Sequence, residues 1–287
     1  MADPVQRRFV ADGVELAADE FLAETPRGTT LLTHGGGQTR HSWKNAARTL
    51  SDHGWTSVTL DTRGHGDSTW APDGNYTMDA LIADLATVTG ALDQPPVLIG
   101  ASMGGVTSLV AAGEGHVKAR GLVLVDVAPR IEPVGAARVR DFMTANPDGF
   151  ASLEEVADAV SAYNPHRSRS TNLEGLKRNV RLKDDGRWHW HWDPALMRRG
   201  DGGTDDETRG VLSYERLKDA ARSLTIPTLL VRGQQSDVVS PEGAAELLEL
   251  VPGSRFVDVR GTGHMVAGDD NDVFTREVLG FLDSLTR

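Results

Sequence analysis

Short apolar runs alternate with longer stretches of helical spacing along most of the chain. Short apolar or β-branched runs bounded by turn residues are typical of strands, whereas apolar residues at a 3.6-residue period indicate helices. The sequence predicts strands over Val5–Val10, Val14–Phe21, Thr29–Thr33, Ser57–Leu60, Pro96–Ile99, Gly121–Val125, Pro227–Val231 and Ser254–Val259. It predicts helices over Ser42–His53, Thr77–Leu92, a stretch ending near Ala112, Pro241–Val251 and Asp272–Leu285.

This alternation of strand and helix predicts an α/β fold with a doubly wound, mostly parallel sheet. The first two strands flank Asp12-Gly13, a turn sequence that favours an antiparallel hairpin. Gly121–Val125 is apolar throughout, as expected for a strand in the centre of a sheet that is covered on both faces.

The alternation stops in the middle of the chain, between about Ala128 and Thr225. That stretch contains a glycine- and aspartate-rich loop, Arg199–Arg209, and four helical patches: Gly135–Thr144, Leu153–Tyr163, Leu173–Leu182 and Val211–Leu224. We therefore expect a core made of residues 1–127 and 226–287, with residues 128–225 forming a helical cap. The cap also contains Trp188-His-Trp-His-Trp192, and Trp192 is a candidate for lining a substrate pocket.

The composition limits which kinds of binding partner and which cellular location we expect. The 287 residues carry a formal net charge of −11, which argues against nucleic acid or an anionic membrane as the main partner. The sequence contains no cysteine, so disulfides and thiolate chemistry are excluded. The N-terminus lacks the apolar region of a signal peptide, and the apolar runs are too short to span a bilayer. We expect a cytoplasmic protein, and the sequence does not indicate its oligomeric state.

One motif points to a nucleophile. Gly100-Ala101-Ser102-Met103-Gly104 is a G-x-S-x-G sequence between a predicted strand and a predicted helix. In that setting the motif forms a sharp turn that presents the serine at the C-terminal edge of a sheet. Its glycines let strand and helix approach closely, and the helix N-terminus adds positive potential for a developing oxyanion. We therefore expect Ser102 to be the catalytic nucleophile.

A serine hydroxyl needs a general base, and the base needs an orienting carboxylate. His264 lies in a glycine-rich loop after the last predicted strand, where it could reach Ser102. Two aspartates follow predicted strands and compete for the role of the acid. We favour Asp237, which lies in a loop opened by Gly233, and keep Asp126 as the alternative; a structural role for Asp126 would be to fix the hinge of the cap.

An oxyanion needs two hydrogen-bond donors. The residue after the nucleophile supplies one, so we expect the backbone N–H of Met103 to take part. The glycine turn His34-Gly35-Gly36-Gly37 follows an earlier strand and exposes bare backbone. We expect the second donor to be Gly36, with Gly35 as the alternative, and Gly35 is also a candidate for contacting the substrate.

These segments together resemble the α/β-hydrolase superfamily over nearly the whole chain: the glycine turn, the loop Asp61-Thr-Arg-Gly-His-Gly-Asp-Ser68, the Ser102 motif, and the late Asp and His loops. The resembling subgroup includes carboxylesterases, enol-lactone hydrolases, cofactor-free perhydrolases and C–C bond hydrolases. Epoxide hydrolases and haloalkane dehalogenases are similar but carry aspartate at the Ser102 position. The family most often places its acid where Asp237 lies, although three residues separate Gly233 from Asp237 here and many relatives have two.

Other signals are weaker. His189 and His191 match part of a zinc-binding H-x-H-x-D pattern, but Pro194 stands where the next histidine is expected, so we predict no metal site. Arg63 and His65 are interpreted as loop structure. His41 and Trp43 could face the pocket, and core packing or helix capping explains them equally well.

The sequence thus predicts a serine hydrolase that cleaves an ester or lactone of a small to medium, mostly apolar substrate without a cofactor. C–C bond hydrolysis of a diketone-like substrate is the alternative reaction, because it uses the same three residues. A non-catalytic small-molecule receptor with a hydrolase fold is the alternative of a different class.

Overall fold

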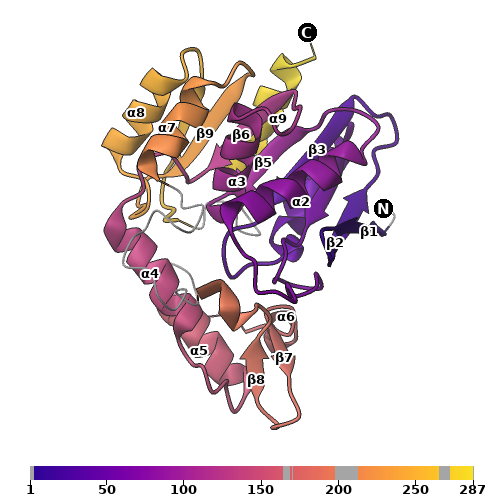
Figure 1. Ribbon diagram of the computed structural model, residues 1–287, viewed down its shortest axis with the longest axis vertical. Coiled ribbons are helices and arrows are strands. Elements are labelled where there is room, and N and C mark those ends of the chain that lie inside the picture. The colour runs from indigo at the N-terminus through magenta and orange to yellow at the C-terminus, as the bar shows by residue number, and fades with distance from the viewer. Residues whose placement is uncertain (1–2, 164–168, 170, 198–212, 265–271, 287) are drawn as a thin grey trace.

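The computed structural model describes residues 3–163, 169, 171–197, 213–264 and 272–286. Its centre is an eight-stranded sheet in the order β1-β2-β4-β3-β5-β6-β9-β10 (Figure 1). Its strands are β1 (Val5–Ala11), β2 (Val14–Phe21), β3 (Gly28–Thr33), β4 (Trp55–Leu60), β5 (Val97–Ala101), β6 (Gly121–Val125), β9 (Thr228–Gly233) and β10 (Arg255–Val259). Strands β1 and β2 pair antiparallel with their neighbours and the rest are parallel, so the predicted fold class is confirmed.

Helices cover both faces of the sheet and bury its apolar side chains in two clusters. One face packs against α2 (Met78–Gly90), α3 (Met103–Gly113), α7 (Tyr214–Arg222) and α8 (Pro241–Leu250). The other packs against α1 (Lys44–Asp52) and α9 (Asp272–Ser284). Strand β6 is buried at every position because both faces of the central sheet are covered.

An insertion follows β6 and forms a separate lobe beside the C-terminal edge of the sheet (Figure 1). We call Pro133–Met197 the insertion. It contains α4 (Pro133–Thr144), α5 (Leu153–Tyr163), α6 (Leu173–Leu176), β7 (Val180–Leu182), β8 (Trp188–Trp190) and a 3₁₀ turn, Pro194–Met197. Its own apolar cluster includes Phe150, Val156, Trp190 and Trp192.

Two details of the insertion differ from the sequence prediction. The patch Leu173–Leu182 is helical only as far as Leu176; Val180–Leu182 then pairs antiparallel with Trp188–Trp190 in a small hairpin. The predicted helical patch ends at Leu182 and does not include Trp188-His-Trp, whose alternating side chains have the two-residue period of a strand.

The second difference is α7, which the sequence prediction assigned to the cap. Leu217, Ala220 and Ala221 of α7 are buried in the same cluster as α3. A Cβ atom at Gly113 of α3 would lie only 2.2 Å from the Ala220 carbonyl oxygen, so the two helices are in close contact. This helix therefore packs on the sheet layer, while the loop Arg199–Arg209 lies outside the described residues. No helix within the described ranges is long and apolar enough to cross a bilayer.

Candidate active site

Ser102 lies in a sharp turn between β5 and α3. Its backbone has φ 45° and ψ −116°, a strained conformation for a non-glycine residue. A Cβ atom at Gly100 would lie 2.5 Å from the Gly104 carbonyl oxygen, and one at Gly104 would lie 2.6 Å from the Thr33 carbonyl oxygen. The glycines of the motif are therefore required by close backbone contacts, and the turn has the geometry expected of a nucleophile at a strand–helix junction.

His264 pairs with Asp126. The His264 Nδ1–H donates to Asp126 Oδ2 over 2.7 Å. The Asp126 carboxylate is fully buried at the end of β6, and it also accepts from the Gly233 N–H at 2.9 Å and the Ser236 Oγ–H at 2.6 Å. Three donors thus hold one carboxylate, which fixes the orientation of the imidazole ring and leaves Nε2 for the nucleophile.

The predicted partner, Asp237, lies elsewhere, so this prediction is corrected. Its carboxylate forms an ion pair with Arg138 of α4, with Nε–Oδ2 and Nη2–Oδ1 distances of 2.7 Å. Both aspartates follow neighbouring strands, but the loop after β9 turns towards the insertion before it reaches Asp237. The alternative that the sequence left open, Asp126, is the residue that contacts His264.

The backbone N–H groups near Ser102 differ in whether they have a hydrogen-bond acceptor. The Gly35 N–H donates to Gln38 Oε1 at 2.9 Å and the Gly37 N–H donates to His65 Nε2 at 3.2 Å. Within the described part of the chain, the N–H groups of Gly36 and Met103 have no hydrogen-bond acceptor. Gly36 and Met103 are the donors that the sequence predicts for an oxyanion hole, whereas the N–H of Gly35, the alternative, already donates to Gln38.

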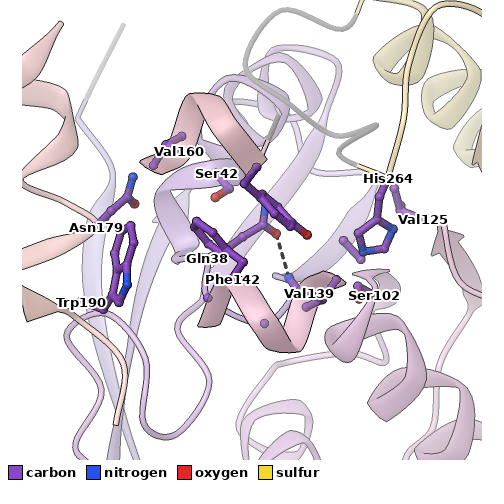
Figure 2. A pocket seen from close by; sticks show the side chains of 15 residues that line it. Gln38, Ser42, Ser102, Val125, Val139, Phe142, Val160, Asn179, Trp190 and His264 are labelled. Atoms are coloured by element: carbon purple, nitrogen blue, oxygen red, sulfur yellow. Dashed lines mark hydrogen bonds between the residues drawn. The ribbon is translucent and has the colours of Figure 1, made fainter. Parts of the chain in front are cut away.

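Ser102 and His264 line one cavity of about 120 Å³. Figure 2 shows these two side chains at one end and Asn179 and Trp190 at the other. The other lining residues are mostly apolar or uncharged: Gly35, Gly36, Gly37, Gln38, Ser42, Ala101, Val125, Val139, Phe142, Val160 and Tyr163. Burial raises the pKa of the Tyr163 hydroxyl, so it remains a neutral group near neutral pH.

Trp190 lines this cavity, and Trp192, the predicted pocket residue, lies behind it. The two indole rings stack with centroids 4.7 Å apart. Both tryptophans line a second cavity of about 280 Å³. Trp192 is therefore absent from the lining of the cavity that contains Ser102, and Trp190 of β8 lies there instead.

The remaining candidates have structural contacts. Arg63 forms a bidentate ion pair with the buried Asp84, at 2.6 and 2.7 Å. Trp43 is buried against Phe274, and His41 lies 3.7 Å from Asp19.

The two histidines of the possible zinc pattern have separate partners. His189 Nε2 pairs with Asp185 at 2.8 Å, whereas both ring nitrogens of His191 bond backbone groups. Within the described ranges, no three or more His, Asp or Glu side chains are arranged so that they could hold one metal ion.

Comparison with known proteins agrees with this geometry. A family model described as the alpha/beta hydrolase fold matches residues 30–270. The chain belongs to the α/β-hydrolase family. It is 31% identical over 281 residues to an esterase of Mycobacterium tuberculosis, covering 94% of this chain and 87% of the esterase. A crystal structure of that esterase superposes with a TM-score of 0.77 at 29% identity, over 99% of this chain and 93% of the esterase chain.

Other relatives are also hydrolases. A 3-hydroxybutyrate-oligomer hydrolase of Cupriavidus necator is 28% identical over 243 residues, covering 82% of this chain and 81% of the relative. The structure of an E-2-(acetamidomethylene)succinate hydrolase superposes with a TM-score of 0.83 over 98% of this chain and 99% of the other, at 24% identity. This second likeness supports the fold, and the relatives together support a hydrolytic reaction.

Proposed function

We propose that this protein is a serine hydrolase that cleaves a carboxylic ester or lactone through an acyl-enzyme. The observation that carries the proposal is the buried Asp126–His264 pair, which opens onto the same cavity as the strained Ser102 turn. A base oriented by a carboxylate and a serine in such a turn are the parts that acyl transfer requires.

The proposed reaction has two halves. His264 Nε2 takes the Ser102 proton as Oγ attacks the substrate carbonyl, and the free N–H groups of Gly36 and Met103 stabilise the oxyanion. His264 then protonates the leaving alcohol. Water, deprotonated by His264, attacks the acyl-enzyme, and His264 returns that proton to Ser102 Oγ as the acid leaves. Asp126 holds the ring in one tautomer and stabilises its charged form throughout. These residues account for each proton transfer without a cofactor.

The lining of the cavity supports a neutral substrate. Its walls are the aliphatic and aromatic side chains of Val139, Phe142, Val160 and Trp190, and the polar groups at the end far from Ser102 are uncharged. The insertion supplies all four of these apolar residues, so we propose that it acts as a cap that selects the acyl group. Apolar walls with a few uncharged polar groups suit a small to medium acyl chain.

A covalent probe tests the proposal. A fluorophosphonate should label the protein on Ser102, as mapped by mass spectrometry, and Ser102→Ala should abolish labelling. The same substitution should lower turnover of p-nitrophenyl esters by a factor on the order of 10⁶ if chemistry limits the rate. A panel that adds lactones and vinylogous diketones separates ester cleavage from C–C cleavage. Labelling that persists in Ser102→Ala, or its complete absence from the native protein, would refute the enzyme and favour a receptor.

A further inference from the structure

Three buried histidines surround the glycine turn that carries the Gly36 N–H. We call His34, His65 and His191 the histidine cluster; each is at most 2% exposed. Their ring centroids lie 5.0 Å apart between His34 and His65 and 5.9 Å apart between His65 and His191. His34 follows β3, His65 comes from the loop after β4, and His191 follows β8 of the insertion, so three distant segments meet here.

The hydrogen bonds assign one neutral tautomer to each ring. His34 Nδ1–H donates to the Gly35 carbonyl at 2.8 Å, because its Nε2 accepts from the Thr62 N–H at 3.1 Å. His65 Nε2 accepts from the Gly37 N–H, so its Nδ1–H donates to the Arg63 carbonyl at 3.2 Å.

His191 follows the same logic. Its Nδ1 accepts from the Gly66 N–H at 2.7 Å, which leaves Nε2–H to donate to the Gly37 carbonyl at 3.4 Å. Burial lowers the pKa of His34 to about 4, with a smaller contribution from the positive charge of Arg40. Burial and, to a smaller extent, His34 lower the pKa of His65 to about 3. Burial and, to a smaller extent, His65 and His34 lower the pKa of His191 well below its ordinary value.

Each histidine holds a different peptide plane of the turn. The Gly35 carbonyl and the Gly36 N–H belong to one planar peptide group and point in opposite directions. His34, by holding that carbonyl, therefore aims the Gly36 N–H away from itself. His65 holds the next plane through the Gly37 N–H, and His191 holds the third through the Gly37 carbonyl. Gly37 has φ 73°. Glycine adopts many backbone conformations, so without these hydrogen bonds the backbone of Gly37 would be free to vary.

The insertion is anchored at the same place. The Asp193 N–H donates to the Gly64 carbonyl at 2.9 Å, and the Tyr76 hydroxyl donates to Asp193 at 2.5 Å. Arg181 binds the Gly66 carbonyl at 3.0 Å. His191 is thus part of a docked segment whose position is fixed against the loop that bears His65.

We propose that His191 is a positioning residue through which the insertion fixes the oxyanion donor of Gly36. Docking of the insertion places the Nε2–H of His191 on the Gly37 carbonyl and completes the clamp on three successive peptide planes. The substrate-selecting lobe then also sets the strength of transition-state stabilisation. This inference rests on the proposed function for its kinetic part, and on the tautomer of His191 for its structural part.

Two substitutions separate the two bonds of His191. In His191→Asn, the side-chain oxygen replaces the Nδ1 acceptor for Gly66 but no donor reaches Gly37. In His191→Gln, the side-chain amide reaches the Nε2 position and retains the donor. Because oxyanion stabilisation acts in the transition state, His191→Asn should lower kcat about tenfold with KM changed less than about twofold. His191→Gln should retain most of the activity, and His189→Asn, which alters a neighbouring histidine paired with Asp185, should match the native enzyme.

The ratio of activities on an ester and on its thionoester distinguishes a positioning role of His191 from a merely structural one, which would leave this ratio unchanged. Sulfur accepts hydrogen bonds weakly, so the native enzyme should prefer the oxygen ester, and His191→Asn should reduce this preference by the factor lost in kcat. Unchanged kcat in His191→Asn, or an equal loss on both substrates, would overturn the inference.

Nitrogen-15 NMR of the histidine rings tests the structural part without any substrate. The native protein should show His191 protonated at Nε2 alone between pH 5 and 8, with the signal assigned by its absence in His191→Gln. Protonation at Nδ1 would overturn the clamp even in an active enzyme. A protein inactive on every ester but with the expected tautomer would instead count against the proposed function.

Discussion

His264 Nδ1 lies 2.7 Å from Asp126 Oδ2, and both side chains are withdrawn from solvent. Asp126 has φ 50°, so its backbone bends sharply as the chain leaves β6. That bend lets the carboxylate point along the edge of the sheet towards β9 and the His264 loop, where it collects the N–H of Gly233 and the hydroxyl of Ser236. The backbone bend with which the chain leaves β6 therefore positions the Asp126 carboxylate.

Exchanging each aspartate for asparagine distinguishes their roles. Asp126→Asn should lower kcat by roughly 10⁴, because the amide favours the wrong tautomer of His264. Asp237→Asn should change kcat little, since it removes only a half-exposed ion pair with Arg138, worth at most about 1 kcal/mol. Steady-state kinetics on one ester, with melting curves of both variants, make the comparison.

A matched control addresses the hydrogen bonds that Asp126 makes to its loop. Ser236→Ala removes one donor to the carboxylate but leaves its charge and its bond to His264. It should cost far less activity than Asp126→Asn. The reverse ranking of the two aspartate variants, in proteins that melt alike, would return the role of the acid to Asp237.

Trp190 should limit the length of the acyl group. It lines both the catalytic cavity and the second cavity behind it. Trp190→Ala should join them and raise kcat/KM for long acyl chains relative to short ones, because specificity follows differential transition-state binding. The measurement is kcat/KM across p-nitrophenyl esters of increasing acyl length.

Trp192→Ala is the control for that experiment. It removes a buried ring that lies behind Trp190, so it should lower stability by about 3–5 kcal/mol and shift the chain-length profile less. A Trp190→Ala enzyme with the native profile, scaled down equally for every ester, would mean that the ring only packs.

The buried histidines should make stability depend on pH. Their folded-state pKa values lie below the ordinary 6.5, so as the pH falls the unfolded chain binds these protons first. The contribution is fully present above about pH 6.5 and is lost as the pH falls towards 4, at about 1.4 kcal/mol per pH unit for each histidine. Urea unfolding at several pH values between 7 and 5 measures this slope.

The variant His65→Gln tests the contribution of one histidine to the pH dependence of stability. The variant is expected to be less stable at pH 7, but its free energy of unfolding should fall less steeply with decreasing pH than that of the native protein, by the contribution of one histidine. Parallel slopes in the two proteins would show that His65 is not a source of the pH dependence.

The sequence predicts the parts of this molecule that depend on local chemistry. The strand–helix alternation, the Ser102 turn and the glycine turn each depend on residue types within a short window, and the structure has them where they were expected. The choice between Asp126 and Asp237 does not depend on such local chemistry. Both follow strands that end at the same edge of the sheet, and only the backbone bend at Asp126 and the direction of the loop after β9 decide which carboxylate meets His264.

The role of the insertion was harder to predict because its contacts are long-range. His191 lies more than a hundred residues from Gly37 and Gly66, and nothing near it in the sequence indicates them. The spacing of His189 and His191 matches part of a metal-binding pattern, whereas in the structure both ring nitrogens of His191 bond backbone groups. The position of Trp190 in the lining of the cavity could be predicted from the sequence, since the alternation in Trp188-His-Trp predicts a strand with one inward face.

The pairing of β5 with β6 fixes how far apart Ser102 and Asp126 lie. Ala101 lies opposite Val125, so Ser102 and Asp126 are the next residues on two hydrogen-bonded strands, and the Ser102 N–H donates to the Val125 carbonyl at 3.1 Å. The register of these two core strands thus sets the spacing between the two residues. We therefore expect that the block 133–197 could be exchanged for that of another hydrolase without altering the spacing between Ser102 and Asp126. To keep the proposed clamp on the glycine turn, the graft would also have to bring its own contact to the Gly37 carbonyl.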